Sequence, residues 1–166
     1  INVSSSFDQF EKVKEISNKN QVIITTHWYG FLPVIMDGMV NFLSIGKDNM
    51  VVSFPMNLGT IPSEIRRLKR ELKGAFPSSI QIKSTTDLVQ SIIASLQAVR
   101  PYNWIICEGQ SEKIYFEYFF EEEIQTKNLR ILPVAGNKNV KKFYDYILTP
   151  ISDEETDYRG KVICLI

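Results

Sequence analysis

The sequence has little that would assign it to a specialised class of protein. Its 166 residues include one histidine and two cysteines, and 19 Lys and Arg residues balance 19 Asp and Glu residues. The absence of net charge argues neither for nor against nucleic-acid binding, so a DNA contact would have to come from a local patch. No apolar run approaches the length of a membrane span and no signal peptide is recognisable. We therefore expect a cytoplasmic protein without a membrane contact.

Two familiar binding motifs are missing as well. Cys107 and Cys164 lie inside apolar runs that predict strands, and no C-x-x-C spacing is present. This pattern indicates buried, reduced thiols and no zinc site, in keeping with a reducing cytosol. The chain has no G-x-x-x-x-G-K-[ST] segment, the loop that holds nucleotide phosphates. We therefore expect that it cannot hydrolyse ATP by itself.

The order of the predicted elements indicates an α/β fold. After residue 100, strands at 104–107, 129–134 and 161–166 alternate with helices at 111–124 and 137–148. Such alternation predicts a parallel sheet with right-handed crossovers. Before residue 100, the pattern predicts a mixture of helices and short strands. These are helices at 7–18, 31–36, 62–75 and 85–96, a buried strand at 22–26, and a hairpin of 39–45 with 50–54.

Two acidic residues stand at the expected carboxyl end of the first parallel strand. Glu108 follows that strand directly, and Glu112 falls four residues later, in the first turn of the next helix. Gly109 permits a tight turn between them, and Ser111 is suited to cap the helix. Ligands bind at the carboxyl ends of parallel strands, and Mg²⁺ or Mn²⁺ would relieve the repulsion between two carboxylates. The alternative is an ordinary strand-to-helix turn in which the helix dipole favours a carboxylate.

Three further features are candidates for function. His27 directly follows the predicted strand at 22–26, a position where α/β proteins contact ligands, although a lone histidine is more often structural. Arg66, Arg70 and Lys73 share one face of the 62–75 helix, which is either a DNA-phosphate contact or a solvated face.

The helix after Glu108 is rich in aromatic residues, which we expect to pack against the sheet and not to stack on bases. They are Tyr115, Phe116, Tyr118, Phe119 and Phe120.

The segment ICEGQSE around Glu108 resembles the first motif of the Toprim domain, which topoisomerases, primases and overcoming-lysogenization-defect (OLD) nucleases share. In that motif a hydrophobic strand ends in Glu-Gly, and Ser-Asp opens the next helix; Glu112 stands where Asp is usual. Residues 129–140 are similar to the second landmark, a strand followed by Gly, Lys and Asn, with Gly136 at the turn. Residues 162–166 resemble the strand of the third landmark, which ends in Asp-x-Asp. We expect the chain to continue and the next residue to be Asp.

The resemblance implies a Rossmann-like Toprim sheet over residues 101–166 and metal-assisted cleavage of phosphodiester bonds. Glu108 would be a metal ligand or a general base, and Glu112 a second ligand, with Mg²⁺ or Mn²⁺ as the cofactor. Lys138 would contact a phosphate as a point charge. For Lys138 the alternative is an exposed lysine in the first turn of a helix.

The stretch 21–27, QVIITTH, resembles the switch or H-loop of ABC-type ATPases, whose histidine senses the ATP γ-phosphate. Trp28 stands where Ser or Asn is usual, and the strand pair at 39–54 is similar to the end of such ATPase domains. The resemblance implies that residues 1–100 are the C-terminal part of an ABC-type ATPase domain with a helical connector. ATP would be bound mainly by residues outside this chain, and the ATPase domains would pair into a homo-oligomer.

An ABC-type ATPase tail followed by a Toprim start is the layout of the OLD family, which includes antiphage defence nucleases. The resemblance therefore implies an ATP-regulated, metal-dependent DNA endonuclease in antiviral defence, acting with DNA and with a defence-system partner of protein, RNA or DNA. The alternative is a degenerate Toprim-like module that binds a partner or nucleic acid without catalysis. Strand passage or primer synthesis is a third hypothesis, which the His27 motif disfavours because those enzymes carry no ABC tail.

Overall fold

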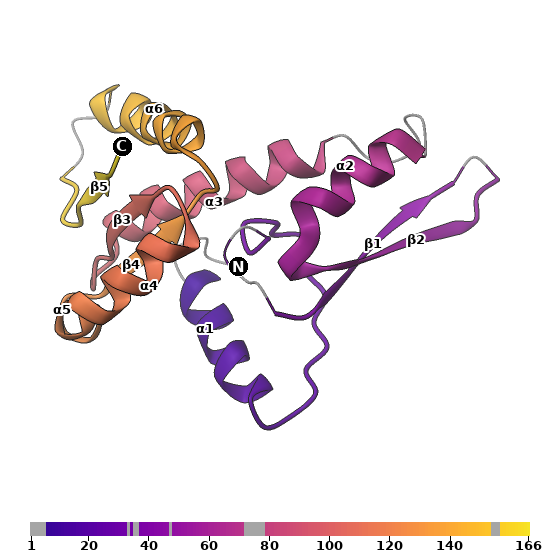
Figure 1. The fold of residues 1–166 in the computed structure, drawn as a ribbon, viewed down its shortest axis with the longest axis horizontal. Coiled ribbons are helices and arrows are strands. Elements are labelled where there is room, and N and C mark those ends of the chain that lie inside the picture. Colours follow the sequence, from indigo (N-terminus) through magenta and orange to yellow (C-terminus); the bar gives the residue numbers. More distant parts are fainter. Residues whose placement is uncertain (1–5, 33, 35–36, 47, 72–78, 154–156) are drawn as a thin grey trace.

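The structure, a computed structural model, places a hairpin with one helix beside a parallel sheet with helices on both faces (Figure 1). A long helix, α3 (Ile80–Leu96), runs between these two parts, and α1 (Ser6–Ser17) stands near the N-terminus. The structure describes residues 6–32, 34, 37–46, 48–71, 79–153 and 157–166.

The predicted hairpin is confirmed. β1 (Met39–Ile45) and β2 (Val51–Asn57) pair antiparallel, with Ile45 opposite Val51. The turn is closed by the Gly46 N–H, which donates to the Met50 carbonyl at 2.8 Å, and Asn49 takes a left-handed conformation with φ 62°. Asn tolerates this conformation better than most side chains, so the turn suits its sequence.

The inward face of the hairpin rests on α2 (Ile61–Glu71), which a short 3-10 helix, η2 (Leu58–Thr60), joins to β2. The predicted apolar face of α2 is confirmed for Ile65 and Leu68, which are buried, whereas residues 72–75 of the predicted helix lie outside the described residues. The buried side chains of this hairpin core are Phe31, Leu32, Phe42, Met56, Leu58, Ile61, Ile65, Leu68 and Ile80.

The predicted strand at 22–26 is wrong. These residues follow an irregular path, and Ile23 is 85% exposed. The run is rich in β-branched residues, but none of the strands in the described part of the chain pairs with it. A β-branched run forms a stable strand only where a neighbour supplies hydrogen bonds and a packing surface. Of the predicted short helix at 31–36, residues 31, 32 and 34 are turns, and the others lie outside the described residues.

The predicted parallel sheet is confirmed, and with it the α/β fold. Its strands are β3 (Asn103–Cys107), β4 (Leu129–Pro133) and β5 (Val162–Cys164), and their spatial order is β4-β3-β5. All pairs are parallel, and Ile105 faces Ile131 on one side and Ile163 on the other. β3 is therefore the central strand of this sheet.

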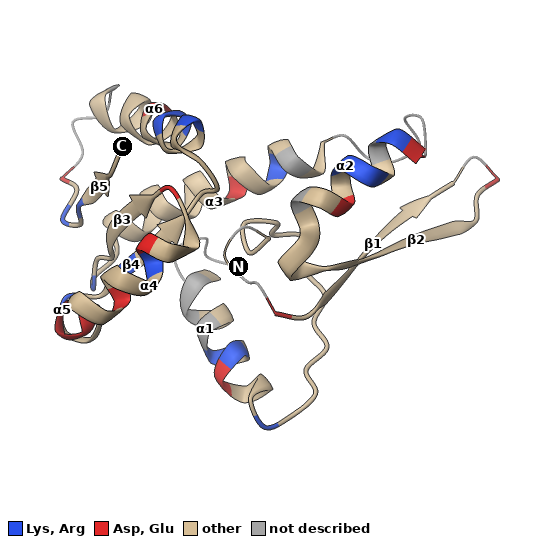
Figure 2. Cartoon of the chain, viewed as in Figure 1, with Lys and Arg blue, Asp and Glu red and all other residues tan. Residues whose placement is uncertain are grey.

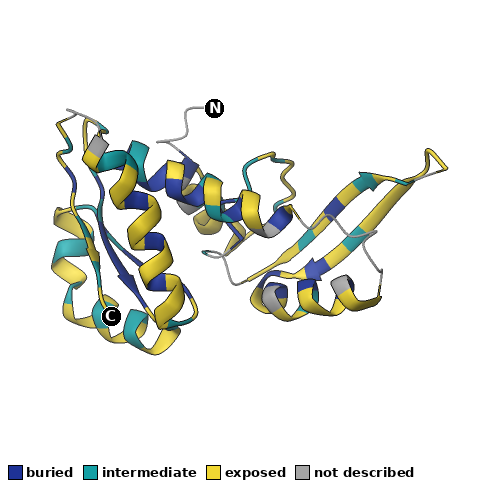
Figure 3. Ribbon diagram, turned by 90° about the horizontal axis from the view of Figure 1, so that it is seen from above, coloured by how far each residue is buried: buried dark blue, intermediate teal, exposed yellow. Residues whose placement is uncertain are grey.

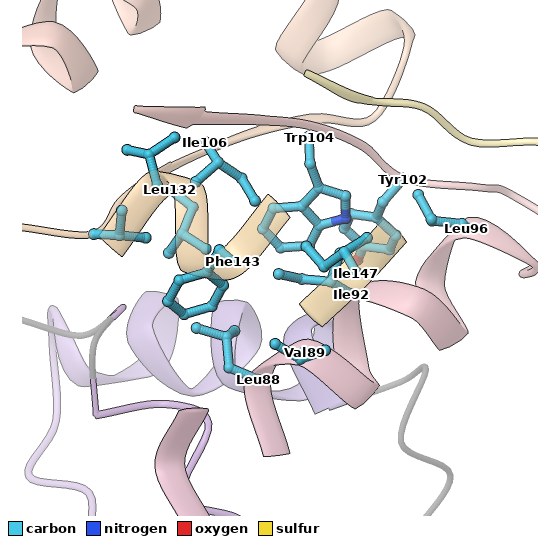
Figure 4. Close-up of a cluster of buried hydrophobic side chains, with 12 residues drawn as sticks. Leu88, Val89, Ile92, Leu96, Tyr102, Trp104, Ile106, Leu132, Phe143 and Ile147 are labelled. Atoms are coloured by element: carbon cyan, nitrogen blue, oxygen red, sulfur yellow. The ribbon is translucent and has the colours of Figure 1, made fainter. Parts of the chain in front are cut away.

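Alternate residues of the strands face opposite layers of helices, which explains why their sequences are almost entirely apolar. One face is covered by α4 (Gln110–Phe119) and α5 (Glu121–Thr126). Ile105 and Ile131 of the sheet pack there against Phe116 of α4, Phe120 between the two helices and Ile124 of α5. On the other face, α3 and α6 (Asn137–Asp153) cover the sheet (Figures 3 and 4). The core on that side consists of Leu88, Val89, Ile92, Leu96, Tyr102, Trp104, Ile106, Leu132, Val134, Val140, Phe143 and Ile147.

Three helix boundaries differ from those predicted. α3 begins at Ile80, more than one helical turn before Thr85, because Ile80 is buried in the hairpin core and anchors the added residues. The residue that precedes α4 and caps it is Gly109, so Ser111 lies inside the helix. The predicted 111–124 helix is divided at Phe120, which leaves helical geometry with φ −112° and ψ 28°.

α3 joins the two parts through packing. Its residues from Leu88 to Leu96 belong to the core of the sheet, while Ile80 belongs to the hairpin core. Trp28 packs against both cores, and its indole N–H donates to the Ser91 Oγ at 2.9 Å. The predicted division at residue 100 remains a prediction. None of the helices in the described ranges is both long and apolar enough to cross a membrane.

Candidate metal site

The order of the parallel strands creates one point where the chain changes direction across the sheet. From the central strand β3 the chain passes over one face to β4, and then returns over the other face to β5. The carboxyl ends of β3 and β5 therefore flank a topological switch point, the place where open α/β sheets bind ligands. Glu108 directly follows β3 and lies at this point.

The backbone of Glu108 is held by the turn that follows β4. The Gly136 N–H donates to the Glu108 carbonyl at 3.0 Å, and the Val134 N–H donates to the Cys107 carbonyl at 3.0 Å. These bonds bring together the two segments that the sequence singled out, around Glu108 and around Gly136. The Glu108 side chain is exposed, so its carboxylate is open to solvent.

Glu112 folds back toward the end of β3. A Cβ added to Gly109 would stand 3.1 Å from the Glu112 Oε2, so this carboxylate lies directly over the glycine. Burial raises the pKa of the Cys107 thiol, and the nearby charge of Glu112 raises that pKa further. Both observations place the Glu112 carboxylate at the strand end that carries Glu108.

The chemistry of these groups fits a hard divalent cation. Mg²⁺ and Mn²⁺ prefer oxygen ligands to a thiol, and Glu108 and Glu112 supply carboxylate oxygens at this strand end. Among the described residues, no group of three or more His, Cys, Asp and Glu side chains is arranged to hold a metal. Glu108 and Glu112 thus offer a pair, and a cation such as Mg²⁺ commonly takes one or two carboxylates and completes its shell with water and phosphate oxygens.

The turn between β4 and α6 contains an element that the sequence did not identify. Ala135 and Gly136 both have positive φ, 57° and 123°, and such a conformation is unfavourable for alanine. The Asn139 side-chain amide donates to the Val134 carbonyl at 2.8 Å and to the Ala135 carbonyl at 3.1 Å. Asn139 therefore stabilises the turn that holds Glu108. In the sequence this role is indicated only by the presence of an Asn three residues after Gly136.

Lys138 lies in the first turn of α6, two residues after Gly136, and its side chain is exposed. The hydrogen bond from Gly136 to Glu108 places the start of α6 beside the candidate metal site. The predicted phosphate contact of Lys138 remains a prediction.

His27 lies at an exposed bend and not at the end of a strand. The Thr26 Oγ1 accepts the Trp28 N–H at 3.0 Å, and Trp28 and Tyr29 attach this loop to α3. The bulky residue after His27 is thus a packing residue. A role of His27 in sensing nucleotide remains a prediction.

The predicted basic face of α2 is exposed at Arg66 and Arg70, and Lys73 lies outside the described residues. Figures 1 and 3 both show α2 next to the hairpin, on the part of the molecule away from the parallel sheet. Arg67, between the two exposed arginines, is paired with Glu64 at 2.8 Å and with Glu71 at 2.7 Å.

The aromatic residues after Glu108 are divided between two environments. Phe116 and Phe120 pack against the sheet as predicted. Tyr115, Tyr118 and Phe119 are between 65% and 79% exposed, so the prediction of sheet packing is wrong for them. The helix presents only one face to β3 and β4, and five aromatic residues within six positions cannot all occupy it.

The sheet also borders a hollow of about 210 Å³ between α6 and β5. Its lining is apolar, with Leu96, Ile147, Ile151 and Cys164 among its residues, and includes neither Glu108 nor Glu112. An apolar lining fits no divalent cation, so this hollow is not the candidate metal site.

The comparison with protein families agrees with the motif positions. Residues 102–149, from the start of β3 into α6, match the family described as overcoming lysogenization defect protein-like, TOPRIM domain. The matched stretch contains Glu108, Glu112, Gly136 and Lys138 and covers less than half of the chain. No curated protein and no solved structure matches the chain.

Proposed function

We propose that residues 101–166 form the first part of a Toprim-type nuclease domain that cleaves DNA with the help of Mg²⁺ or Mn²⁺. The match over residues 102–149 indicates a nuclease-type module. The observation that carries the proposal is the position of Glu108, directly after the central strand at the switch point. The Glu108 side chain is exposed, and the Glu112 carboxylate lies over Gly109 at the same strand end.

In this proposal Glu108, Glu112 and Lys138 have different roles in the cleavage reaction. When bound, a divalent cation supplies Lewis-acid stabilisation of the scissile phosphate. Glu108 would contact that cation directly or accept the proton of the attacking water, and Glu112 would provide a second carboxylate oxygen. Lys138 would contact a non-bridging phosphate oxygen as a point charge. The turn at Ala135 and Gly136 would hold Glu108 and Lys138 in register through the Gly136–Glu108 hydrogen bond.

We further propose that this activity is regulated by ATP in an OLD-type protein of antiphage defence. The support is the order of motifs, an H-loop-like segment ending at His27 followed by the Toprim-like segment. In this arrangement residues 1–100 would belong to an ABC-type ATPase domain, and most contacts to ATP would come from other residues of the protein. Pairing of the ATPase domains would form a homo-oligomer in the cytoplasm, with DNA and a defence-system partner as ligands.

The proposal is tested by Glu108→Ala in the full-length protein that carries this chain, with nicking of supercoiled DNA in Mg²⁺ or Mn²⁺ as the assay. Loss of a residue that only supports a metal ligand typically lowers metal affinity or activity by about 10- to 100-fold. Loss of a direct ligand should therefore reduce the cleavage rate by at least about 100-fold. Glu117→Ala is the matched control, because Glu117 lies on the same helix and pairs with Lys113 at 3.6 Å. The thermal melting temperature of both variants should equal that of the wild type. Undiminished cleavage by Glu108→Ala would falsify the assigned site.

One observation favours the alternative of a degenerate module: the described residues supply a pair of carboxylates and no cluster of three metal ligands. In that case Glu108 would only favour the start of α4 through the helix dipole. The two functions differ in their response to divalent ions. A degenerate module should bind DNA or a partner equally well with Mn²⁺ and with a chelator, and Glu108→Ala should leave that binding unchanged.

A further inference from the structure

The first two turns of α6 carry three exposed lysines on one face. Lys141 and Lys142 follow Lys138 by three and four positions, so all three lie on one side of the helix. The opposite side is buried against the sheet through Val140 and Phe143. We call these three residues the lysine face. Because packing uses the opposite side of α6, the lysine face has no role in the core. Figure 2 shows basic residues, in blue, on the first part of α6.

The lysine face is also unfavourable for the stability of the helix. The start of a helix carries a partial positive charge that disfavours cations, and the first turn of α6 has no acidic residue. Among the residues that the structure describes, no ion pair involves any of these three lysines. Lys142 lies 5.4 Å from the ring centre of Tyr146. Asp145 stands four positions after Lys141 and three after Lys142 on the same side of α6, but among the described residues no ion pair joins it to either lysine.

Several other cations in the described part of the chain form ion pairs, whereas Arg66 and Arg70 on α2 resemble the lysine face in forming none there. Arg67, Lys83, Lys113 and Lys127 each pair with an acidic residue three or four positions away on their own helix. α6 concentrates three cations in its first two turns, and the helix dipole opposes the one in the first turn, Lys138. A surface that lowers helix stability and lacks internal partners is suited to an external anion.

The position of the lysine face selects the anion. The Gly136 N–H donates to the Glu108 carbonyl, and Lys138 follows two residues later, so the face begins at the candidate metal site. At 1.5 Å per residue, Lys142 lies about 6 Å further along the helix axis than Lys138. Cations spread along a line fit a series of phosphates better than a single small anion, and lysine contacts phosphates without reading bases.

We propose that the lysine face binds the sugar–phosphate backbone of DNA next to the scissile phosphate, and that this contact is independent of base sequence. The inference rests on the proposed function and adds Lys141 and Lys142 to it as positioning residues. It also favours α6 over α2 as the DNA-binding helix, because α2, which carries Arg66 and Arg70, lies in the part of the molecule away from the parallel sheet (Figures 1 and 3).

The test compares two double variants of the full-length protein, Lys141→Gln with Lys142→Gln, and Arg66→Gln with Arg70→Gln. Each removes two exposed cations. Binding to a fluorescent duplex of mixed sequence is measured in EDTA, where no cleavage occurs, over a series of salt concentrations. Each lost phosphate contact should reduce the slope of log K against log salt by about 0.9, so the α6 variant should lose about 1.8. At 0.1 M salt its affinity should fall roughly 10- to 100-fold.

The α2 variant should keep both the wild-type slope and the wild-type affinity. The inference is overturned if the α6 variant keeps the wild-type slope, or if the α2 variant loses as much. Because binding is measured without metal, these outcomes are separate from those of Glu108→Ala. Cleavage that persists in Glu108→Ala removes the proposed metal site, while a reduced salt slope in the α6 variant still establishes the DNA contact.

Discussion

Replacement of Gly160 by alanine should destabilise the sheet although the added group is a single methyl. The Arg159 and Gly160 N–H groups donate to the Leu96 carbonyl at 3.1 and 3.0 Å, which holds this segment against the end of α3. A Cβ on Gly160 would stand 2.1 Å from the Tyr102 carbonyl oxygen and 3.1 Å from the Leu96 Cα. Close carbon–oxygen contacts lie near 3.3 Å, so the backbone must move by about 1 Å.

The size of the effect follows from these contacts. Overpacking typically costs 1–3 kcal/mol, and weakening of the Gly160–Leu96 hydrogen bond adds about 0.5–1.5 kcal/mol, for a total of about 2–4 kcal/mol. In urea unfolding, with a slope of roughly 2 kcal/mol/M, the midpoint should fall by about 1–2 M.

Gly109→Ala is the matched control for this prediction. The nearest atom to its added Cβ is the Glu112 Oε2 at 3.1 Å, at the end of a flexible side chain, and Gly109 has an extended backbone. This variant should lose about 1 kcal/mol or less, the usual range for a change at a helix cap. Equal midpoints for Gly160→Ala and the wild type would show that the segment before β5 does not pack against α3 as described.

Two further predictions concern the attachment of the 26–34 loop and the response to pH. Asp87→Ala should lower stability by about 1–3 kcal/mol in urea unfolding, because the Asp87 Oδ2 accepts the half-buried Tyr29 N–H at 2.7 Å. Lys83→Ala keeps that hydrogen bond and removes the exposed ion pair with Asp87 and the contact of Lys83 with the Tyr29 ring, so it should cost less than about 1 kcal/mol. An equal loss in both variants would contradict this assignment. Burial raises the pKa of the Cys107 and Cys164 thiols, so the unfolded chain releases these protons first. The protonated thiols therefore contribute to folding stability below the ordinary thiol pKa, and this contribution is lost as the pH rises through the pKa of the folded state. Above pH 8, a variant with both cysteines replaced by serine should lose less of its urea midpoint than the wild type.

The sequence predicted the parallel sheet well because its strands have a strong and unambiguous signal. Ile105 and Ile106 lie in a strand that is buried on both faces, which gives the continuous apolar run typical of a central parallel strand. Glu108 ends that run abruptly, so the position of the candidate metal site relative to the strand could also be predicted.

Other features depend on contacts that no local pattern contains. The run at 22–26 has the composition of a strand, but the described chain offers no partner for it. The true start of α3 depends on Ile80 packing in the hairpin core, whose other residues lie 12 or more positions earlier in the sequence. The pairing of Gly136 with Glu108 depends on the strand order, which is a property of the whole sheet.

The most direct test of the central claim is to measure how many Mn²⁺ ions the full-length protein binds. Electron paramagnetic resonance gives the concentration of free Mn²⁺, and the bound amount follows by difference. Two carboxylates at the end of β3 should hold the cation, so replacement of Glu108 and Glu112 by glutamine should remove Mn²⁺ binding at this site. The matched variant Glu117→Gln, on the outer part of α4, should bind as the wild type does. Unchanged Mn²⁺ stoichiometry and affinity in the double variant would contradict the claim that this strand end is a metal site.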